Sequence, residues 1–425
     1  MGAAFLYLCT MEKNEVKGSL RTIAVGFLVL VALLICYGAI RANWKKEAAD
    51  PTPKYIFLFI GDGMGNSHVC AAESYLSWKK GKLGGEQLCF TQFPELAMAS
   101  TYSADHQVTC SSAAATAFSS GHKTNNLFIG ATPDSLPTRP FTMDLHEKGY
   151  RVGIMSSVPI NHATPAAFYA HQTNRWGYYP ISKQLPASGY EFFAGPGFAE
   201  WRGRDGEQQP TGEFLAENGY TIAWGEEEFR AQMDKEHLIF CQASNRDRSA
   251  SEYTIDYDST WTSLADMLRL GIEYLDDEEP FVIMCEGGEI DWCAHENSVY
   301  PMVQSILRFD DAVKVAYAFY EEHPEETLIV VTADHETGGL AIGYNFDWQF
   351  SVQDWDKMEA RWIADGYTDK MTPQERMAFQ NECGFGWTTN EHTGAPVPVY
   401  AVGKGAERFH GRIDNTDIPA LIVGK

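Results

Sequence analysis

Short apolar runs alternate with longer amphipathic stretches along most of the chain. Five of these runs predict buried strands, at residues 55–60, 151–155, 281–285, 328–332 and 397–402. The stretch from Val303 to Glu322 has the spacing of an amphipathic helix that crosses between strands. Near-continuous apolar strands separated by helices are typical of parallel sheets with both faces covered. The pattern predicts an α/β fold with a central, mostly parallel sheet and helices on both faces.

Two regions of the chain lack a clear period. Aromatic, glycine and charged residues are mixed between residues 190 and 251 and again between 344 and 390, so we expect insertions that decorate the sheet. No internal repeat and no flexible linker divides the rest. The simplest division is one domain over residues 51–425, preceded by a separate segment, 1–50.

The segment before residue 51 differs from the body. Residues 22–40 form an uncharged apolar stretch with basic residues on both sides, and this length can span a bilayer. A buried core helix is the alternative, but an apolar run this close to the N-terminus with basic flanks favours a signal peptide or a membrane anchor helix. We therefore expect the body to be exported to a periplasmic or extracellular location, with cleaved, lipidated and membrane-anchored forms all open.

Composition and charge restrict the partners and the chemistry. The chain has 33 Lys and Arg against 57 Asp and Glu, a formal net charge of −24, and no basic stripe that would bind a nucleic acid duplex. Hydrophobic residues make up 44% and charged residues 21%, which excludes a disordered protein. The body has an odd, scattered set of cysteines without a Cys-x-x-Cys pair. Any metal ion must therefore be bound by histidines and carboxylates.

Acidic side chains and histidines gather after the predicted strands. Asp62 follows the first strand, Glu286 the third, and Asp334 with His335 the fourth. A single acidic residue in such a place is usually a turn former or a helix cap. The carboxyl ends of parallel strands, however, meet at one edge of the sheet, where ligands bind. Three carboxylates delivered to that edge indicate a metal site.

Further candidate ligands lie near the same strands. Asp291 and His295 are four residues apart, which puts both side chains on one face of a helical turn. His392 stands shortly before the last predicted strand. We expect His171, by contrast, to be structural.

The candidate nucleophile is Ser111, in a run of small residues that predicts a helix closed by Gly121. A serine at the start of a helix is commonly an N-cap. A helix N-terminus is also an anion site, so a serine there can attack a phosphoryl group whose oxygens are bound by backbone N–H groups. The spacing leaves both interpretations open.

Taken together and in order, these motifs resemble the alkaline phosphatases, from about Tyr55 to about Val402. The matching segments are IGDGMG around Asp62, VTCSSAAATAFSSG around Ser111, HATPAA around Thr164, HQTNR ending at Arg175, EGGEID from Glu286 to Asp291 with His295 beyond it, TADHETGG around Asp334 and His335, and EHTG around His392. The resemblance implies an alkaline-phosphatase-like fold and a hydrolase of small-molecule phosphate monoesters. It leaves the oligomeric state open, with a homodimer as one arrangement.

The resemblance also implies the cofactors and the role of each residue. Two zinc ions and one magnesium ion would be held, the first zinc by Asp291, His295 and His392, the second by Asp62, Asp334 and His335, and the magnesium by Asp62, Thr164 and Glu286. Ser111 would become phosphorylated, and Arg175 would grip two phosphate oxygens. Two zinc ions about 4 Å apart can stabilise the attacking and leaving oxygens of such a displacement.

Three positions depart from the pattern of well-known relatives. Cys110 stands where bacterial relatives have an aspartate that could orient Arg175, His162 where they have Asp or His, and Trp292 where they have Lys or His. These departures bear on phosphate release and on whether the third site takes magnesium or zinc. The alternative function is a phosphodiesterase of the same superfamily, which differs chiefly in what contacts the second ester group.

Overall fold

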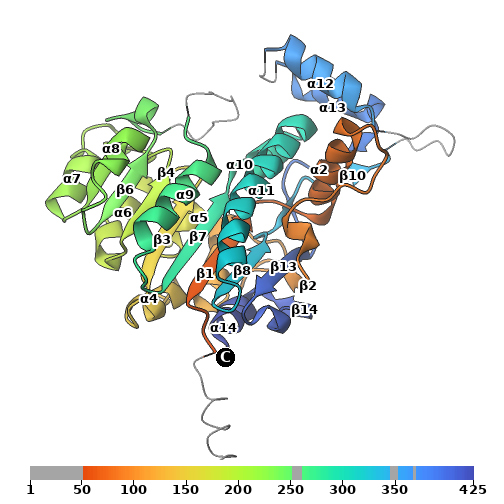
Figure 1. Cartoon of the computed structure of the whole chain (residues 1–425). Helices are drawn as coiled ribbons and strands as arrows, with labels where there is room; N and C mark the ends of the chain where they lie inside the picture. Colours follow the sequence, from red (N-terminus) through yellow and green to blue (C-terminus); the bar gives the residue numbers. More distant parts are fainter. Residues whose placement is uncertain (1–50, 251–260, 345–352, 367–369) are drawn as a thin grey trace, which may run out of the picture. The chain divides into compact units, whose positions relative to one another are not determined.

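Ten strands form one sheet in the part of the chain that the computed structural model describes, residues 51–250, 261–344, 353–366 and 370–425 (Figure 1). In order across the sheet they are β14 (Gly411–Asp414), β2 (Glu95–Ser100), β13 (Val397–Gly403), β8 (Thr327–Thr332), β1 (Tyr55–Gly61), β7 (Phe281–Gly287), β3 (Arg151–Ser156), β4 (Phe192–Gly195), β6 (Leu238–Cys241) and β5 (Thr221–Trp224). All neighbours are parallel except that β13 is antiparallel to both β2 and β8. The predicted strands and the mostly parallel sheet are confirmed.

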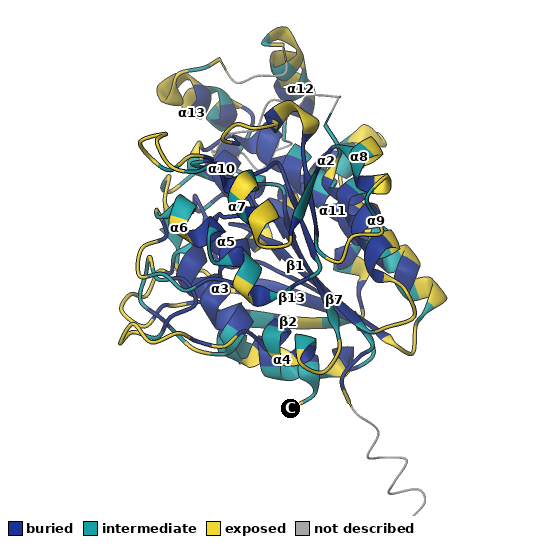
Figure 2. Cartoon of the chain, turned by 90° about the vertical axis from the view of Figure 1, so that its left-hand side faces the viewer, coloured by how far each residue is buried: buried dark blue, intermediate teal, exposed yellow. Residues whose placement is uncertain are grey.

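Helices cover the sheet on both faces, as the sequence predicts. Figure 2 shows α3, α5 and α6 on one side of the central strands and α9 and α11 on the other. The helices are α2 (Asn66–Lys79), α3 (Ser111–Ser120), α4 (Phe141–His146), α5 (Ala163–Ala166), α6 (Tyr178–Ser182), α7 (Thr211–Glu217), α8 (Glu226–Arg230), α9 (Leu264–Leu275), α10 (Glu289–His295), α11 (Val299–Glu322), α12 (Trp355–Ala364), α13 (Pro373–Glu382) and α14 (Ile418–Val423). Two short antiparallel pairs complete the strands, β10 (Ala341–Ile342) with β11 (Phe385–Gly386) and β9 (Glu336–Thr337) with β12 (His392–Thr393).

The core of the fold is built on the central strands of the sheet, in which every residue is buried. This holds for all of β1, β7 and β8, whose apolar sequences leave neither face suited to water. Phe57 in β1 is fully buried, and its ring packs edge-on against Phe281 of β7 and Phe319 of α11. The predicted crossover helix is therefore α11, and its buried face closes one side of the sheet.

The two aperiodic regions differ in what they add. Residues 190–251 contribute β4, β6 and β5, which continue the sheet to its edge, together with α7 and α8. The described part of 344–390 contributes α12, α13 and the short strand β11. Among the described residues, no helix has the length and apolar character needed to cross a bilayer. The predicted signal or anchor segment lies outside these residues.

We predict that Phe57→Ala lowers the free energy of unfolding by about 3–5 kcal/mol, since it leaves a cavity beneath α11 in a core with no room to collapse. Denaturant unfolding followed by circular dichroism measures the change. Leu136→Ala, in which the parent side chain is 62% exposed, is the matched control and should change stability by less than about 0.5 kcal/mol. Equal effects of the two substitutions would contradict this description of the core.

Candidate active site

Four neighbouring strands deliver polar side chains to one edge of the sheet. Asp62 follows β1, Glu286 lies near the end of β7, Asp334 comes two residues after β8, and Ser156 ends β3. The strands are adjacent in the order β8, β1, β7, β3, and the in-register pairing of β7 with β3 puts Glu286 beside Ser156. Parallel alignment thus brings together residues that are far apart in the sequence.

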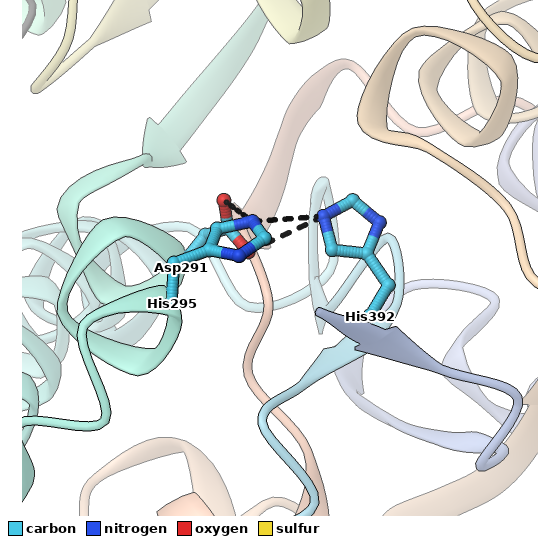
Figure 3. A group of neighbouring side chains, drawn as sticks. All are labelled: Asp291, His295 and His392. Carbon is cyan, nitrogen blue, oxygen red and sulfur yellow. Dashed lines mark hydrogen bonds and ion pairs between the residues drawn. The ribbon is translucent and has the colours of Figure 1, made fainter. Parts of the chain in front are cut away.

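The first group of candidate metal ligands consists of Asp291 and His295 from α10 and His392 from β12 (Figure 3). The Nε2 atoms of His295 and His392 are 3.1 Å apart. Asp291 Oδ2 is 3.3 Å from His295 Nε2, and its Oδ1 is 3.7 Å from His392 Nε2. Three potential ligand atoms therefore lie close together. The four-residue spacing predicts that Asp291 and His295 share a helix face, and the fold brings His392 next to them.

The hydrogen bonds of the two histidines show which nitrogen is free to bind a cation. Nδ1 of His295 lies 2.6 Å from the carbonyl oxygen of Asn390, and Nδ1 of His392 lies 2.8 Å from that of Thr109. A carbonyl oxygen only accepts, so each Nδ1 carries the proton and donates it. Both Nε2 atoms then present lone pairs to each other, an arrangement that a bound cation stabilises.

Two further groups share Asp62. Its carboxylate lies with Asp334 and His335 in the second group and with Glu286 and His162 in the third. Nε2 of His335 is 3.2 Å from Asp334 Oδ2 and 3.5 Å from Asp62 Oδ1. Asp62 therefore stands between the second and third groups, as the resemblance implies for a residue that binds two ions.

Burial makes it costly for these neighbouring carboxylates to be charged together unless a cation neutralises them. Asp62, Glu286 and Asp334 are fully buried. Burial raises the pKa of Glu286 and of Asp334 to about 7 each, and it raises the pKa of Asp62 as well, because the charged forms lose water. Both oxygens of Asp62, Oε1 of Glu286, Oδ2 of Asp334 and Oγ1 of Thr164 have no hydrogen-bond partner. Unpaired buried oxygens at this density fit the ligand set of divalent cations.

Ser111 is the first residue of α3, and its hydroxyl points to the same region. Cys110 occupies the N-cap position, so the N-cap interpretation of Ser111 is wrong. Ser111 Oγ accepts a hydrogen bond from Arg175 Nη1 at 3.3 Å and lies 3.3 Å from His335 Nε2. The predicted nucleophile therefore contacts both the predicted phosphate-binding arginine and a predicted metal ligand.

His162 supports Arg175 where Cys110 does not. Arg175 Nη2 donates to Nε2 of His162 at 3.3 Å, while the Cys110 thiol contacts Ser112 Oγ and accepts from the backbone N–H of Leu127. Burial, and then the charge of Arg175, lower the pKa of His162 to about 3, so the imidazole is neutral and able to accept. Trp292 packs edge-on against this ring. One cavity of about 360 Å³ is lined by Ser111 together with Cys110, Leu127, His162, Arg175 and Trp292.

Comparison with known proteins places the site in a family. The sequence profile of the alkaline phosphatases matches residues 53–192 and 212–424. The chain belongs to the alkaline phosphatase family. It is therefore an enzyme of the phosphomonoesterase class, and the gap in the match, residues 193–211, begins within β4 and lies in the first aperiodic region.

Relatives of known name and structure cover nearly the whole length. Alkaline phosphatases 4 and 3 of Bacillus subtilis (strain 168) are 29% and 30% identical, over 90% and 89% of this chain and 90% of each relative. The alkaline phosphatase of the Antarctic bacterium TAB5 superposes with a TM-score of 0.72 at 29% identity, covering 88% of this chain and 98% of its own. A mutant of that enzyme has Mg bound in its M3 site, with a TM-score of 0.71.

Two side chains that steady the alkaline phosphatase ligands escaped the sequence analysis. The hydroxyl of Ser156 donates to Glu286, and that of Thr337 donates to Asp291. Ser156 carries a usable signal, since it is a polar residue at the end of a predicted strand. Thr337 lies within the TADHETGG segment, but that segment alone does not predict its contact with Asp291, which is 46 residues away in the sequence.

A glycine next to Asp62 provides a test of how tightly the site is built. We predict that Gly63→Ala abolishes most phosphatase activity, because the added Cβ would lie 2.8 Å from the Cα of Asp291 and 2.9 Å from its Oδ1. Initial rates with p-nitrophenyl phosphate and denaturant unfolding measure the effect.

The matched control is Gly81→Ala. Gly81 has nearly the same backbone angle (φ 69°, against 73° at Gly63), but nothing lies within 4 Å of the added Cβ. It should lower the free energy of unfolding by only about 1–2 kcal/mol, the cost of the left-handed backbone alone, and keep activity. If the two variants lose activity alike, crowding against Asp291 is not the cause.

Proposed function

We propose that the chain hydrolyses phosphate monoesters through a phosphoserine on Ser111, at a site that holds two zinc ions and one magnesium ion. The observation that supports this most directly is the hydroxyl of Ser111, which contacts both Arg175 and His335 beside the three groups of ligands. Membership of the alkaline phosphatase family supports the reaction class.

The proposed ligand sets follow the three groups. The first zinc is assigned to Asp291, His295 and His392, the second to Asp62, Asp334 and His335, and the magnesium to Asp62, Glu286 and Thr164. When bound, such ions stabilise negative charge on the attacking and leaving oxygens and lower the pKa of the groups they bind. Carboxylate and hydroxyl oxygens at the third set suit magnesium, with His162 as a further nitrogen near it.

The chain's own residues then perform two displacements. Ser111 Oγ attacks phosphorus, the bond to the ester oxygen breaks, and the alcohol leaves with a proton. A water molecule next attacks the phosphoserine, and the bond from phosphorus to Oγ breaks, so that phosphate is released and Ser111 recovers its hydroxyl proton. The net reaction consumes one water for each ester bond.

Arg175 holds the phosphoryl group during both steps. Its two terminal nitrogens already bind Ser111 and His162, so the guanidinium plane is fixed before substrate arrives. A planar fork of this kind pairs with two non-bridging oxygens at once. Because His162 is neutral, it orients Arg175 without cancelling the positive charge that the phosphate needs.

The setting of this reaction is also a proposal. The apolar stretch at residues 22–40 with its basic flanks supports export, either by a cleaved signal or with a retained membrane anchor. We place the catalytic domain in the periplasm or outside the cell, with small-molecule phosphate monoesters as substrates, no nucleic acid duplex as partner, and a homodimer as the candidate assembly.

The first test removes the metal ions. Chelation should abolish turnover and zinc should restore it, and His335→Ala or Asp291→Ala should lower the bound zinc measured by elemental analysis, because each leaves one ligand set incomplete. His171→Ala is the control, since that imidazole instead contacts the carbonyl oxygen of Gly130. Full activity of a verified metal-free preparation would contradict the proposal.

The second test looks for the covalent intermediate. Enzyme quenched in acid during turnover should carry phosphate on Ser111, identified by peptide mass spectrometry. Ser111→Ala should lose this label, although water can still attack slowly while the metal ions and Arg175 remain. Ser112→Ala is the neighbouring control and should keep the label. Phosphate found on Ser112 alone, or on no serine, excludes the assigned nucleophile.

The third test separates monoesterase from diesterase. Arg175→Ala should lower kcat/KM for monoesters by an amount equivalent to about 2–4 kcal/mol, since a preorganised charge is lost from the transition state. Diesters should lose less, because they carry one charge fewer and a second substituent. Arg175→Lys, which keeps the charge without the fork, should fall between. A parent enzyme that hydrolyses diesters faster than matched monoesters favours the alternative function.

A further inference from the structure

Two large apolar side chains stand exposed at the cavity that holds Ser111 and Arg175. Leu127 is 43% exposed and Trp176 is 50% exposed, and both line this cavity. Neither takes part in the two displacements or in a ligand group. Apolar surface that remains open beside a charged site is characteristic of a surface that a ligand covers.

The backbone of Leu127 is fixed in an unusual conformation. Its φ of 72° lies in the left-handed region, which a leucine rarely adopts. Its N–H donates to Cys110 Sγ at 3.1 Å, and its carbonyl oxygen accepts the backbone N–H of Arg175 at 2.9 Å. The backbone of Leu127 is therefore held by the residue before Ser111 and by the predicted phosphate-binding residue Arg175. Cys110, which does not orient Arg175, holds Leu127 instead.

Trp176 packs against the guanidinium group of the same arginine. The guanidinium carbon of Arg175 is 5.1 Å from the centroid of its ring, and Tyr178 packs edge-on against the ring at 6.4 Å. Its backbone N–H donates to Asn174 Oδ1. The ring is thus oriented by two contacts, with Arg175 and Tyr178, and half of the residue is still exposed for another ring to pack on.

We propose that Leu127 and Trp176 form a wall for the leaving group, and that the enzyme prefers phosphate monoesters whose alcohol carries a planar aromatic ring. The phosphate end of such a substrate binds to Arg175, which contacts Leu127 through its backbone N–H and Trp176 through its guanidinium group. The ring then packs on Trp176 and against Leu127, both of which adjoin that arginine. This inference rests on the proposed function, because it requires the phosphoryl group to lie at Ser111.

Benzyl phosphate and ethyl phosphate form a matched pair of substrates, since both are esters of primary alcohols and differ in the ring. In the metal-loaded enzyme, Trp176→Ala should lower the ratio of kcat/KM for benzyl over ethyl phosphate about three- to tenfold, the range expected from loss of one aromatic contact. Trp176→Phe should restore most of the ratio. Leu127→Asn, which suits the left-handed backbone but removes the apolar surface, should lower the ratio about two- to fivefold.

Two controls separate the wall from its neighbours. Leu83→Ala removes a side chain that is 85% exposed and does not line the cavity, and it should leave the ratio unchanged. Inorganic phosphate has no ring to pack on the wall, so the Trp176 and Leu127 variants should weaken inhibition by benzylphosphonate more than inhibition by phosphate.

The outcomes distinguish this inference from the proposed function. A ratio that falls in both wall variants, with the ring-specific loss of phosphonate inhibition, supports the wall. If the parent enzyme hydrolyses both esters but the variants keep its ratio, the wall is overturned and the monoesterase stands. If the variants lose phosphate and benzylphosphonate inhibition equally, Trp176 acts only through Arg175, which also overturns it. If the parent hydrolyses neither ester, the proposed function itself fails.

Discussion

Four carboxylates meet in a region of the fold that excludes water, and this crowding governs the rest of the site. Asp62, Glu286, Asp291 and Asp334 are nearly or fully buried, and the guanidinium of Arg175 is the one permanently charged cation among the described side chains lining the adjoining cavity. Like charges at this density oppose folding unless protons or metal ions neutralise them. The parallel sheet imposes much of the crowding, because β8, β1 and β7 end at the same edge and bring Asp334, Asp62 and Glu286 together, while Asp291 comes from α10. Divalent ions bound at these groups would therefore stabilise the fold as well as serve the proposed reaction.

The histidines complete this arrangement because the backbone orients them. Carbonyl oxygens of Asn390 and Thr109 fix the protons of His295 and His392 on the nitrogens that face away from the group. Thr337 donates to Asp291 in the same way that Ser156 donates to Glu286. Orienting contacts of this type raise metal affinity without touching the ion. The supporting shell therefore comes from loops, from the short strand β9 and from the end of β3 in the main sheet.

Much of the fold could be predicted because its signals are local. Apolar runs marked β1, β3, β7, β8 and β13, and the acidic residues after three of them indicated the site edge. The spacing of Asp291 and His295 identified one helical face. Residues whose positions depend on long-range contacts could not be found this way. Leu127 with its positive φ follows two asparagines in a local turn, but its contacts with Cys110 and Arg175 join separate segments and leave no local signal.

Cys110 shows how a departure from a family pattern can be compensated elsewhere. The Cys110 thiol contacts Ser112 and Leu127 and does not orient Arg175. His162 orients the guanidinium group instead, by accepting a hydrogen bond from Arg175 Nη2. A neutral imidazole accepts a hydrogen bond without adding negative charge, so the guanidinium stays fully attractive to phosphate. Orientation and charge, which an aspartate would couple, are separated in this chain.

The reversed direction of β13 has a consequence for how the site comes into being. This strand is antiparallel to β8, so it begins at the edge where the parallel strands end, and β12 with His392 precedes it there. The first ligand group joins residues of α10 to a histidine 97 positions beyond His295. During synthesis, a chain that ends between Asp334 and His392 has all four carboxylates but cannot close that group. The three-residue group therefore forms only after both α10 and the later β12 have been made.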